Sequence, residues 1–416
     1  MSEQIAVDQD AGYYYPINRI AVRFCTFLMA AIASLALTLN AFLESFRATH
    51  LGAVLVVLIA LHSLWHSRVL WRREYALYVL FLGYMCVGLI WTHDVDLAMN
   101  TLAPSVTCLL VMIFFGSLMG FHHVPTALAG ALFGFVVCAA LYTLTQGFPF
   151  SYPDEFPYNA IAGMYLFGLF ITLMYSCFRR RSSILLLALA FVIMLHIVAT
   201  TSIKTNLGIA LGVVAAGIMY TRHFGRLLRR RLWALIVLGC VLGFAVASND
   251  LLLDQMGRGV QRVLVGVQVL QTRDDVAGYS AYAERDYWKR AGIEGWEQNP
   301  VFGYGTEAFR HDYGITSHST PIDLLYGHGL IGLLLFYGMF ASLFWRLLQL
   351  ADRRFTGQRS LIFGGVICYV FVSLSGTLHY NSFLAAFIGI SAALLTGHGG
   401  AAVSTAAASN RRVGRQ

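Results

Sequence analysis

Apolar runs separated by short polar segments fill most of this chain, and one long polar stretch interrupts them. A membrane-spanning helix needs about 20 mostly apolar residues, and the runs near that length predict twelve transmembrane helices. They lie near residues 23–43, 48–65, 75–92, 98–119, 126–146, 159–177, 183–200, 206–221, 232–248, 321–345, 361–378 and 381–397. We therefore predict an all-α, polytopic membrane protein with a single integral membrane domain over residues 1–416.

The long polar stretch, residues 249–320, falls between the ninth and tenth predicted helices. Apolar residues recur there at helical spacing and predict an amphipathic helix on the membrane surface: Leu253, Met256, Val260, Val263, Val267 and Leu270. A second helix is predicted from Ala281 to Glu297, where Arg285, Trp288 and Gly292 share one face. A turn-rich segment follows it, from Gln298 to Gly305.

Composition agrees with a membrane protein. The chain has 416 residues, of which 58% are hydrophobic and 12% charged, whereas soluble domains have about 45–50% and about 25%. The net charge of +8 is not accompanied by a nucleic-acid-binding motif, so we expect no nucleic-acid partner. All seven cysteines lie in or at the ends of apolar runs, which indicates neither a disulfide framework nor a cysteine metal site.

The arginines indicate orientation in the membrane. Most basic residues form clusters on one side of the predicted helices: Arg19 and Arg23; Arg68, Arg72 and Arg73; Arg179 to Arg181; Arg222, Arg226 and Arg229 to Arg231; Arg346, Arg353, Arg354 and Arg359; Arg411, Arg412 and Arg415. Cytoplasmic loops carry an excess of Lys and Arg. The pattern therefore predicts that both termini are cytoplasmic and that residues 249–320 lie outside the cytoplasm.

The candidate chemistry lies where the polar stretch ends. His318 and Ser319 come just before apolar sequence resumes at Pro321, so His318 is predicted at the membrane–water boundary. Gly329 and Gly332 follow on the next helix, where small residues allow close packing against a neighbouring helix. A single histidine in a loop is often structural, and its setting favours a functional role. His311 and His379, which also lie near an outer boundary, are alternative catalytic bases.

His318-Ser319 followed at a fixed gap by Gly329-x-x-Gly332 resembles the shared motif of the O-antigen ligase and O-antigen polymerase superfamily. The helix led by Arg285 and the Pro-x-x-Gly-x-Gly turn at residues 300–305 resemble the same superfamily. So does the segment 200–207, with Lys204 where arginine is usual. Lysine keeps the positive charge and loses the bidentate fork of arginine. The resemblance covers residues 200–335 and is only topological elsewhere.

The resemblance implies a GT-C-like glycosyltransferase that moves an undecaprenyl-diphosphate-linked O-antigen onto a sugar hydroxyl of lipid A-core. The reaction takes place at the periplasmic face of the bacterial inner membrane. His318 is expected to be the general base, since imidazole titrates near pH ~6.5. Lys204 and Arg285, with Arg47 as a third candidate, are expected to hold the diphosphate. We expect membrane lipids as partners, no metal, no cofactor, and inversion at the anomeric carbon.

Three alternatives stay open at this point. Each cation could instead contact lipid headgroups or pair with Asp250, Glu284 or Asp286. A polymerase of the same superfamily would carry two sizeable outer loops, each with Arg-x10-Gly, whereas this chain has one long loop and no arginine there with Gly at that offset. A lipid or solute transporter would place charges deep in its helices and show repeated halves, and charge within the predicted spans is scarce, with His196 the main exception.

Overall fold

The computed structural model describes residues 19–43, 47–65, 71–121, 123–146, 158–178, 184–199, 202, 204–219, 280–349 and 356–395. These residues form helices and the turns between them, and no strand occurs within these ranges. The helices are α1 (Arg19–Phe42), α2 (Ala48–Trp65), α3 (Arg73–Gly88), α4 (Val95–Phe121), α5 (Val124–Gln146), α6 (Tyr158–Phe178), α7 (Ile184–Ala199), α10 (Ser280–Gln298), α11 (Ala308–Tyr313), α12 (Thr320–Gln349) and α13 (Thr356–Ser373). Two further helices are Lys204–Met219 and Ser382–Leu395.

The all-α prediction is confirmed for the described residues. Five helices among them are long and apolar enough to cross a membrane, namely α1, α4, α5, α6 and α12, with mean hydropathy between 1.7 and 2.1. Shorter apolar helices lie at 48–63, 184–197, 204–219 and 382–395. The total of twelve spans stays a prediction. The expected span 232–248 and the expected amphipathic helix 253–270 lie outside the described residues.

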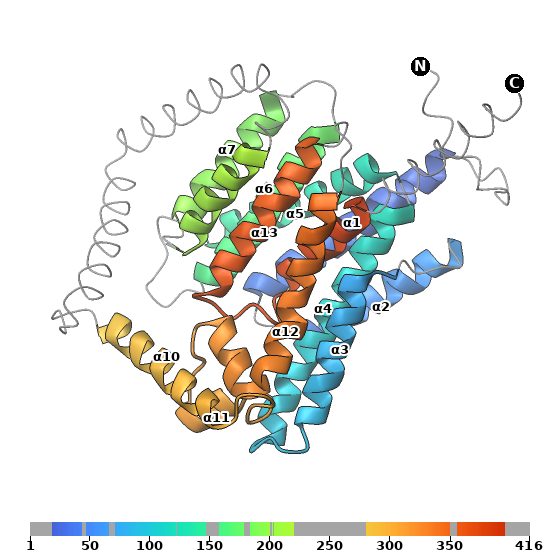
Figure 1. Ribbon diagram of the computed structural model, residues 1–416. Coiled ribbons are helices and arrows are strands. Elements are labelled where there is room, and N and C mark those ends of the chain that lie inside the picture. The colour runs from blue at the N-terminus through green and yellow to red at the C-terminus, as the bar shows by residue number, and fades with distance from the viewer. Residues whose placement is uncertain are drawn as a thin grey trace, which may run out of the picture.

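The helices form a bundle in which α12 runs alongside α3 and α13 (Figure 1). α1 packs most extensively against α5, and α12 against α3. Glycines allow the closest of these contacts: a Cβ at Gly130 or Gly134 on α5 would lie 2.2 Å from the carbonyl oxygen of Phe27 or Ala31 on α1. Helices in lipid associate through such small residues, because close backbone approach maximises van der Waals packing.

α10 and α11 lie across one end of the bundle (Figure 1). The helix expected at 281–297 is confirmed as α10. Its predicted face packs inward: Trp288 contacts the ring of Phe309 on α11, and Gly292 and Gly295 let side chains of α12 approach, with Tyr326 Cε2 2.3 Å from the position of a Cβ at Gly295. A small aromatic cluster therefore fixes α10 and α11 on the end of α12.

α12 is broken at Gly329, where φ is +59° and ψ is −160°. A break leaves backbone N–H and C=O groups without helical partners. The turn before α11 supplies them: the N–H of Tyr304 donates to Tyr326 O at 2.9 Å, and the N–H of Gly305 donates to Gly327 O at 2.7 Å. In return, the N–H of Leu330 donates to the carbonyl oxygen of residue 300 at 2.9 Å. The predicted Pro-x-x-Gly-x-Gly turn thus fills the break.

The predicted role of the Gly329-x-x-Gly332 pair therefore needs correction. Gly329 does not pack against a neighbouring helix. A Cβ there would lie 2.3 Å from the carbonyl oxygen of Val301 in the inserted turn, and the positive φ also favours glycine. A Cβ at Gly332 would meet the side chain of His328 on the same helix at 2.2 Å. The motif shapes a discontinuous helix, a feature that places polar groups at membrane depth in other membrane proteins.

Candidate functional site

His318 is held in a strained turn just before α12. Its φ is +56°, a left-handed conformation that few residues other than glycine adopt. Ser317 closes the turn: its hydroxyl donates to the carbonyl oxygen of Ser319 at 3.0 Å and accepts from the Ser319 N–H at 3.2 Å. Such strain persists only where the surrounding contacts enforce it, and it often marks functional sites.

Asp323, in the first turn of α12, joins the His318 turn to the segment that follows α13. Its Oδ1 accepts from the backbone N–H of Ser317 at 3.0 Å, and its Oδ2 accepts from the hydroxyl of Thr377 at 3.1 Å. We call residues 374–381, between α13 and the last helix, the connecting segment. One buried carboxylate therefore positions the His318 turn against the connecting segment.

Lys204 reaches the same segment from another helix. It is the first residue of the helix Lys204–Met219, and its Nζ donates to the carbonyl oxygen of Ser375 at 2.9 Å. A Cβ at Gly376 would lie only 2.7 Å from that Nζ. The carbonyl oxygen of Gly376 accepts from the hydroxyl of Thr320 at 2.6 Å and from its N–H at 3.2 Å. Lys204 and the residue two places after His318 therefore meet at Gly376.

Arg285 lies near the start of α10, where its side chain is exposed although Trp288 and Gly292 further along the same face pack inward. Burial, together with the charge of Arg285, lowers the pKa of Lys204 to about 8. The two predicted diphosphate-binding cations are thus close enough to repel each other. An anion bound between them would relieve that repulsion. Arg47, the third predicted cation, is exposed at the start of α2 next to α4, and its role stays a prediction.

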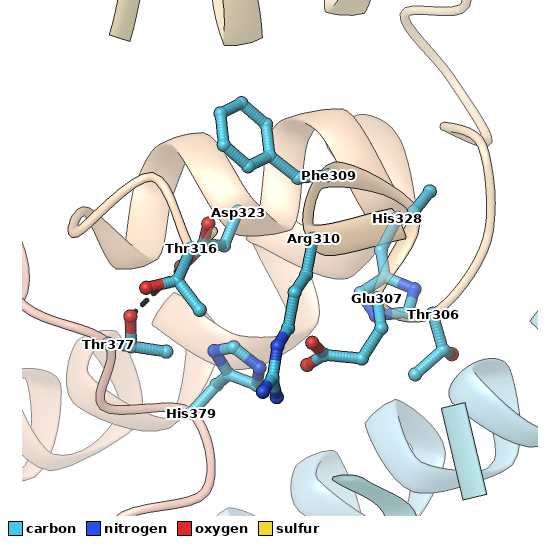
Figure 2. Close-up of a pocket in the computed structure, with 10 residues that line it drawn as sticks. Thr306, Glu307, Phe309, Arg310, Thr316, Asp323, His328, Thr377 and His379 are labelled. Atoms are coloured by element: carbon cyan, nitrogen blue, oxygen red, sulfur yellow. Dashed lines mark hydrogen bonds between the residues drawn. The ribbon is translucent and has the colours of Figure 1, made fainter. Parts of the chain in front are cut away.

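A pocket lies beside the connecting segment, which contributes Thr377 and His379 to its lining (Figure 2). Polar and charged side chains dominate its lining, which consists of Thr306, Glu307, Ala308, Phe309, Arg310, Thr316, Asp323, His328, Thr377 and His379. Figure 2 shows Arg310 extending toward His379 and the carboxylate of Glu307, with His328 on the other side of Glu307. Asp323 and Thr377 connect this pocket to the His318 turn.

The two alternative bases differ in their surroundings. Burial, together with the neighbouring His328, lowers the pKa of His379 to about 3. A general base works best with a pKa near the working pH, so His379 is a poor candidate. His311 lies on the exposed side of α11, with Nδ1 2.8 Å from Asp312 Oδ1 and its ring stacked on His93. His318 remains the candidate base that the motif and the strained turn favour.

The sequence did not single out Glu307, Arg310 or Asp323, although all three lie within a few residues of the motifs. Glu307 is notable because its φ is +60°, a second strained position next to the turn that fills the α12 break. Burial raises its pKa and the Asp323 carboxylate adds to that effect, while the Thr101 hydroxyl and Arg310 oppose it. Sequence position was the signal that could have identified them. Glu307 and Arg310 follow the Pro-x-x-Gly-x-Gly turn, and Asp323 lies between His318 and Gly329.

The apolar helices indicate a multi-pass membrane protein. The polar and charged residues at one end of the bundle form a candidate active site. Residues 188–337 match the family model described as O-Antigen ligase. The match supports the resemblance to the O-antigen ligase and polymerase superfamily that the motifs show. It covers Lys204, Arg285 and His318, whereas Arg47 lies outside it. No curated protein matches the chain significantly.

Proposed function

We propose that this protein is an O-antigen ligase. It transfers a glycan from an undecaprenyl-diphosphate carrier to a sugar hydroxyl of lipid A-core at the periplasmic face of the inner membrane. The acceptor oxygen attacks the anomeric carbon of the donor and forms the new glycosidic bond. The bond from that carbon to the diphosphate oxygen breaks, its electron pair leaves with the lipid diphosphate, and the configuration inverts. His318 takes the proton of the acceptor hydroxyl.

The observation that carries this proposal is the meeting of the predicted site residues at the connecting segment. Lys204 donates to Ser375 O, Arg285 lies within electrostatic reach of Lys204, and the turn of His318 is tied to the segment through Thr320 and Asp323. Two cations near the segment that anchors the turn of a potential base suit a reaction in which a diphosphate departs. Fixed cations stabilise negative charge as it develops on a leaving group.

The direct test is glycan transfer by the purified full-length chain in detergent or nanodiscs, with lipid-linked glycan as donor and lipid A-core as acceptor. His318→Ala should reduce kcat by about 10²–10⁴-fold, the usual contribution of a general base. His311→Ala, which removes the exposed histidine of α11, should stay within about twofold of wild type. Equal thermal unfolding of the variants would show that the fold is intact, and a parallel reaction with a chelator tests the expectation that no metal takes part.

Normal transfer by His318→Ala would overturn the assignment of the base, and loss of transfer in His311→Ala alone would move that role to His311. A deletion strain separates the ligase from the polymerase. Loss of all polymer on lipid A, with polymer accumulating on the lipid carrier, identifies a ligase. Lipid A capped with a single repeat unit would instead identify a polymerase, which the single long outer stretch of this chain disfavours. Movement of lipid-linked glycan across liposomes without glycosidic bond formation would identify a transporter.

A further inference from the structure

The pocket beside the connecting segment contains two buried histidines, each with one ring nitrogen that has no hydrogen-bond partner. The side chains of His328 and His379 are 3% and 6% exposed, and Nδ1 of each has no hydrogen-bond partner. Both line the pocket beside Glu307 and Arg310 (Figure 2). A buried polar atom without a partner costs about 1–3 kcal/mol. Two such atoms in one polar pocket favour a bound molecule that donates or accepts hydrogen bonds there.

The chemistry of the lining favours a hydroxylated ligand. A neutral imidazole offers one donor and one acceptor, a carboxylate only accepts, and a guanidinium only donates. Thr316 adds a hydroxyl that can do both, whereas the hydroxyls of Thr306 and Thr377 already donate to Met85 O and Asp323 and can only accept from a ligand. A sugar hydroxyl also donates and accepts at the same oxygen. The low pKa of His379 keeps its ring neutral, which preserves this mixture of donors and acceptors at neutral pH.

Charge distinguishes the pocket from the cation site formed by Lys204 and Arg285. Lys204 and Arg285 offer two positive charges to a diphosphate. The pocket instead places the carboxylates of Glu307 and Asp323 near each other, since the Asp323 charge raises the pKa of Glu307. A diphosphate in the pocket would face both carboxylates at short range. A neutral polyhydroxylated group would not be repelled.

Hydrogen bonds also fix the position of the pocket relative to the turn of His318. Asp323 belongs to its lining and at the same time accepts from the N–H of Ser317, one residue before His318. Thr306 belongs to its lining as well, and its hydroxyl donates to Met85 O on α3 at 3.1 Å. Glu307 is held at a positive φ directly after this anchor. Strain at such a position persists where a side chain is held for function.

We propose that the pocket formed by Glu307, Arg310, His328 and His379 is the acceptor-sugar subsite. It binds the hydroxyls of the acceptor sugar residue and presents one of them to His318, whose turn is tied to the lining through Asp323. Glu307 and His379 are substrate-binding residues in this arrangement, and they set acceptor specificity. The inference rests on the proposed transferase function.

The test measures steady-state transfer with the donor and the acceptor varied separately. Glu307→Gln and His379→Gln should each raise KM for lipid A-core by about tenfold or more, because each removes or weakens hydrogen bonds in a buried site, and those to a charged group contribute about 1.5–3 kcal/mol. KM for the lipid-linked donor should stay within about twofold. Glu294→Gln, on the exposed side of α10, is the matched control and should change neither constant. Lys204→Gln should show the opposite pattern, with donor KM raised and acceptor KM preserved.

Binding of lipid A-core to the full-length chain without donor gives a second measurement, which does not need turnover. Native mass spectrometry should show acceptor bound to wild type and to Glu294→Gln, and weaker binding to Glu307→Gln. Thermal unfolding of each variant identifies any that fails to fold, in which case His379→Gln carries the test. Unchanged acceptor KM and unchanged acceptor binding in folded variants would overturn the subsite. Absence of any transfer by wild type, with acceptor still bound, would instead count against the proposed transferase.

Discussion

The two segments of α12 on either side of Gly329 differ in what holds them. The segment after the break, residues 330–349, packs its apolar side chains against α3, with Phe336 5.8 Å from the ring of Phe81. The segment before the break, residues 320–328, combines packing of Ile322 and Tyr326 in the aromatic cluster with hydrogen bonds made by Asp323, Thr320 and the backbone of the inserted turn. Apolar packing tolerates small adjustments, whereas hydrogen bonds fix direction and distance. One helix therefore contributes both a scaffold and the geometry of a site.

The largest effect that separates the two segments is expected at the break itself. Gly329→Ala places a Cβ 2.3 Å from Val301 O at a positive φ, which costs about 3 kcal/mol if the turn must move, equivalent to about a hundredfold loss of transfer. Gly338→Ala, in the packed segment, meets only ordinary contacts with Leu77 at 3.6 Å and should keep transfer within about twofold. Transfer assays with both purified variants measure the difference. Equal losses would show that the break has no special role.

A smaller effect is expected when the hydrogen bonds of the first segment are removed. Asp323→Ala removes the acceptor of both the Ser317 N–H and the Thr377 hydroxyl, so the His318 turn loses its link to the connecting segment. We expect kcat to fall about tenfold, since one oriented hydrogen bond to a charged group contributes about 1.5–3 kcal/mol. Thr377→Val, which removes only one of the two bonds, should fall less. A pH profile of kcat shifted in Asp323→Ala would show that His318 is affected, and an unchanged profile would restrict Asp323 to the fold.

The cation site should respond to pH. Because burial and Arg285 lower the pKa of Lys204 from 10.5 to about 8, Lys204 is charged below pH 8 and loses its proton as the pH rises through that value. KM for the donor should therefore rise between pH 7 and pH 9, by up to about tenfold when one protonated group governs binding. Lys204→Arg keeps its charge throughout and should show a flat donor KM over this range. A rise of the same size in Lys204→Arg would exclude Lys204 as its cause.

The smallest effect on transfer is expected from the polar contact inside the packed segment. Glu74 on α3 is fully buried, accepts from the Ser342 hydroxyl at 2.7 Å and lies 3.4 Å from Nε of Arg346. Glu74→Gln leaves Arg346 without its carboxylate and should lower the unfolding temperature, since breaking a buried pair is destabilising. Donor and acceptor KM of the folded variant should match wild type. A changed KM would show that the two segments of α12 are coupled through the bundle.

The sequence predicted the elements whose signal is local. Apolar runs located the helices within a few residues, and α10 was expected at 281–297 and lies at 280–298. The motif residues Lys204, Arg285 and His318 were identified because each stands in a short pattern. The contacts at Ser375 and Gly376 bring Lys204 and Thr320, two residues after His318, to one segment, and the roles of the three residues stay predictions.

The pocket was not predictable in the same way. Glu307 and His379 are separated by more than 70 positions and come together only because the turn at 299–305 fills the break in α12. No local pattern encodes that contact. The same turn explains why Gly329 was interpreted as a helix-packing residue: its sequence spacing is that of a packing motif, and only the three-dimensional neighbour, Val301, shows that it ends one helix and begins another.

The connecting segment has a consequence of its own, because it contacts both candidate sites. Its backbone carbonyls at Ser375 and Gly376 accept from Lys204 and Thr320, and its residues Thr377 and His379 line the pocket. A molecule bound at one site that shifts this segment alters the other site. If binding of the lipid diphosphate changes the affinity for the sugar by some factor, thermodynamic reciprocity requires that the sugar changes the affinity for the lipid diphosphate by the same factor.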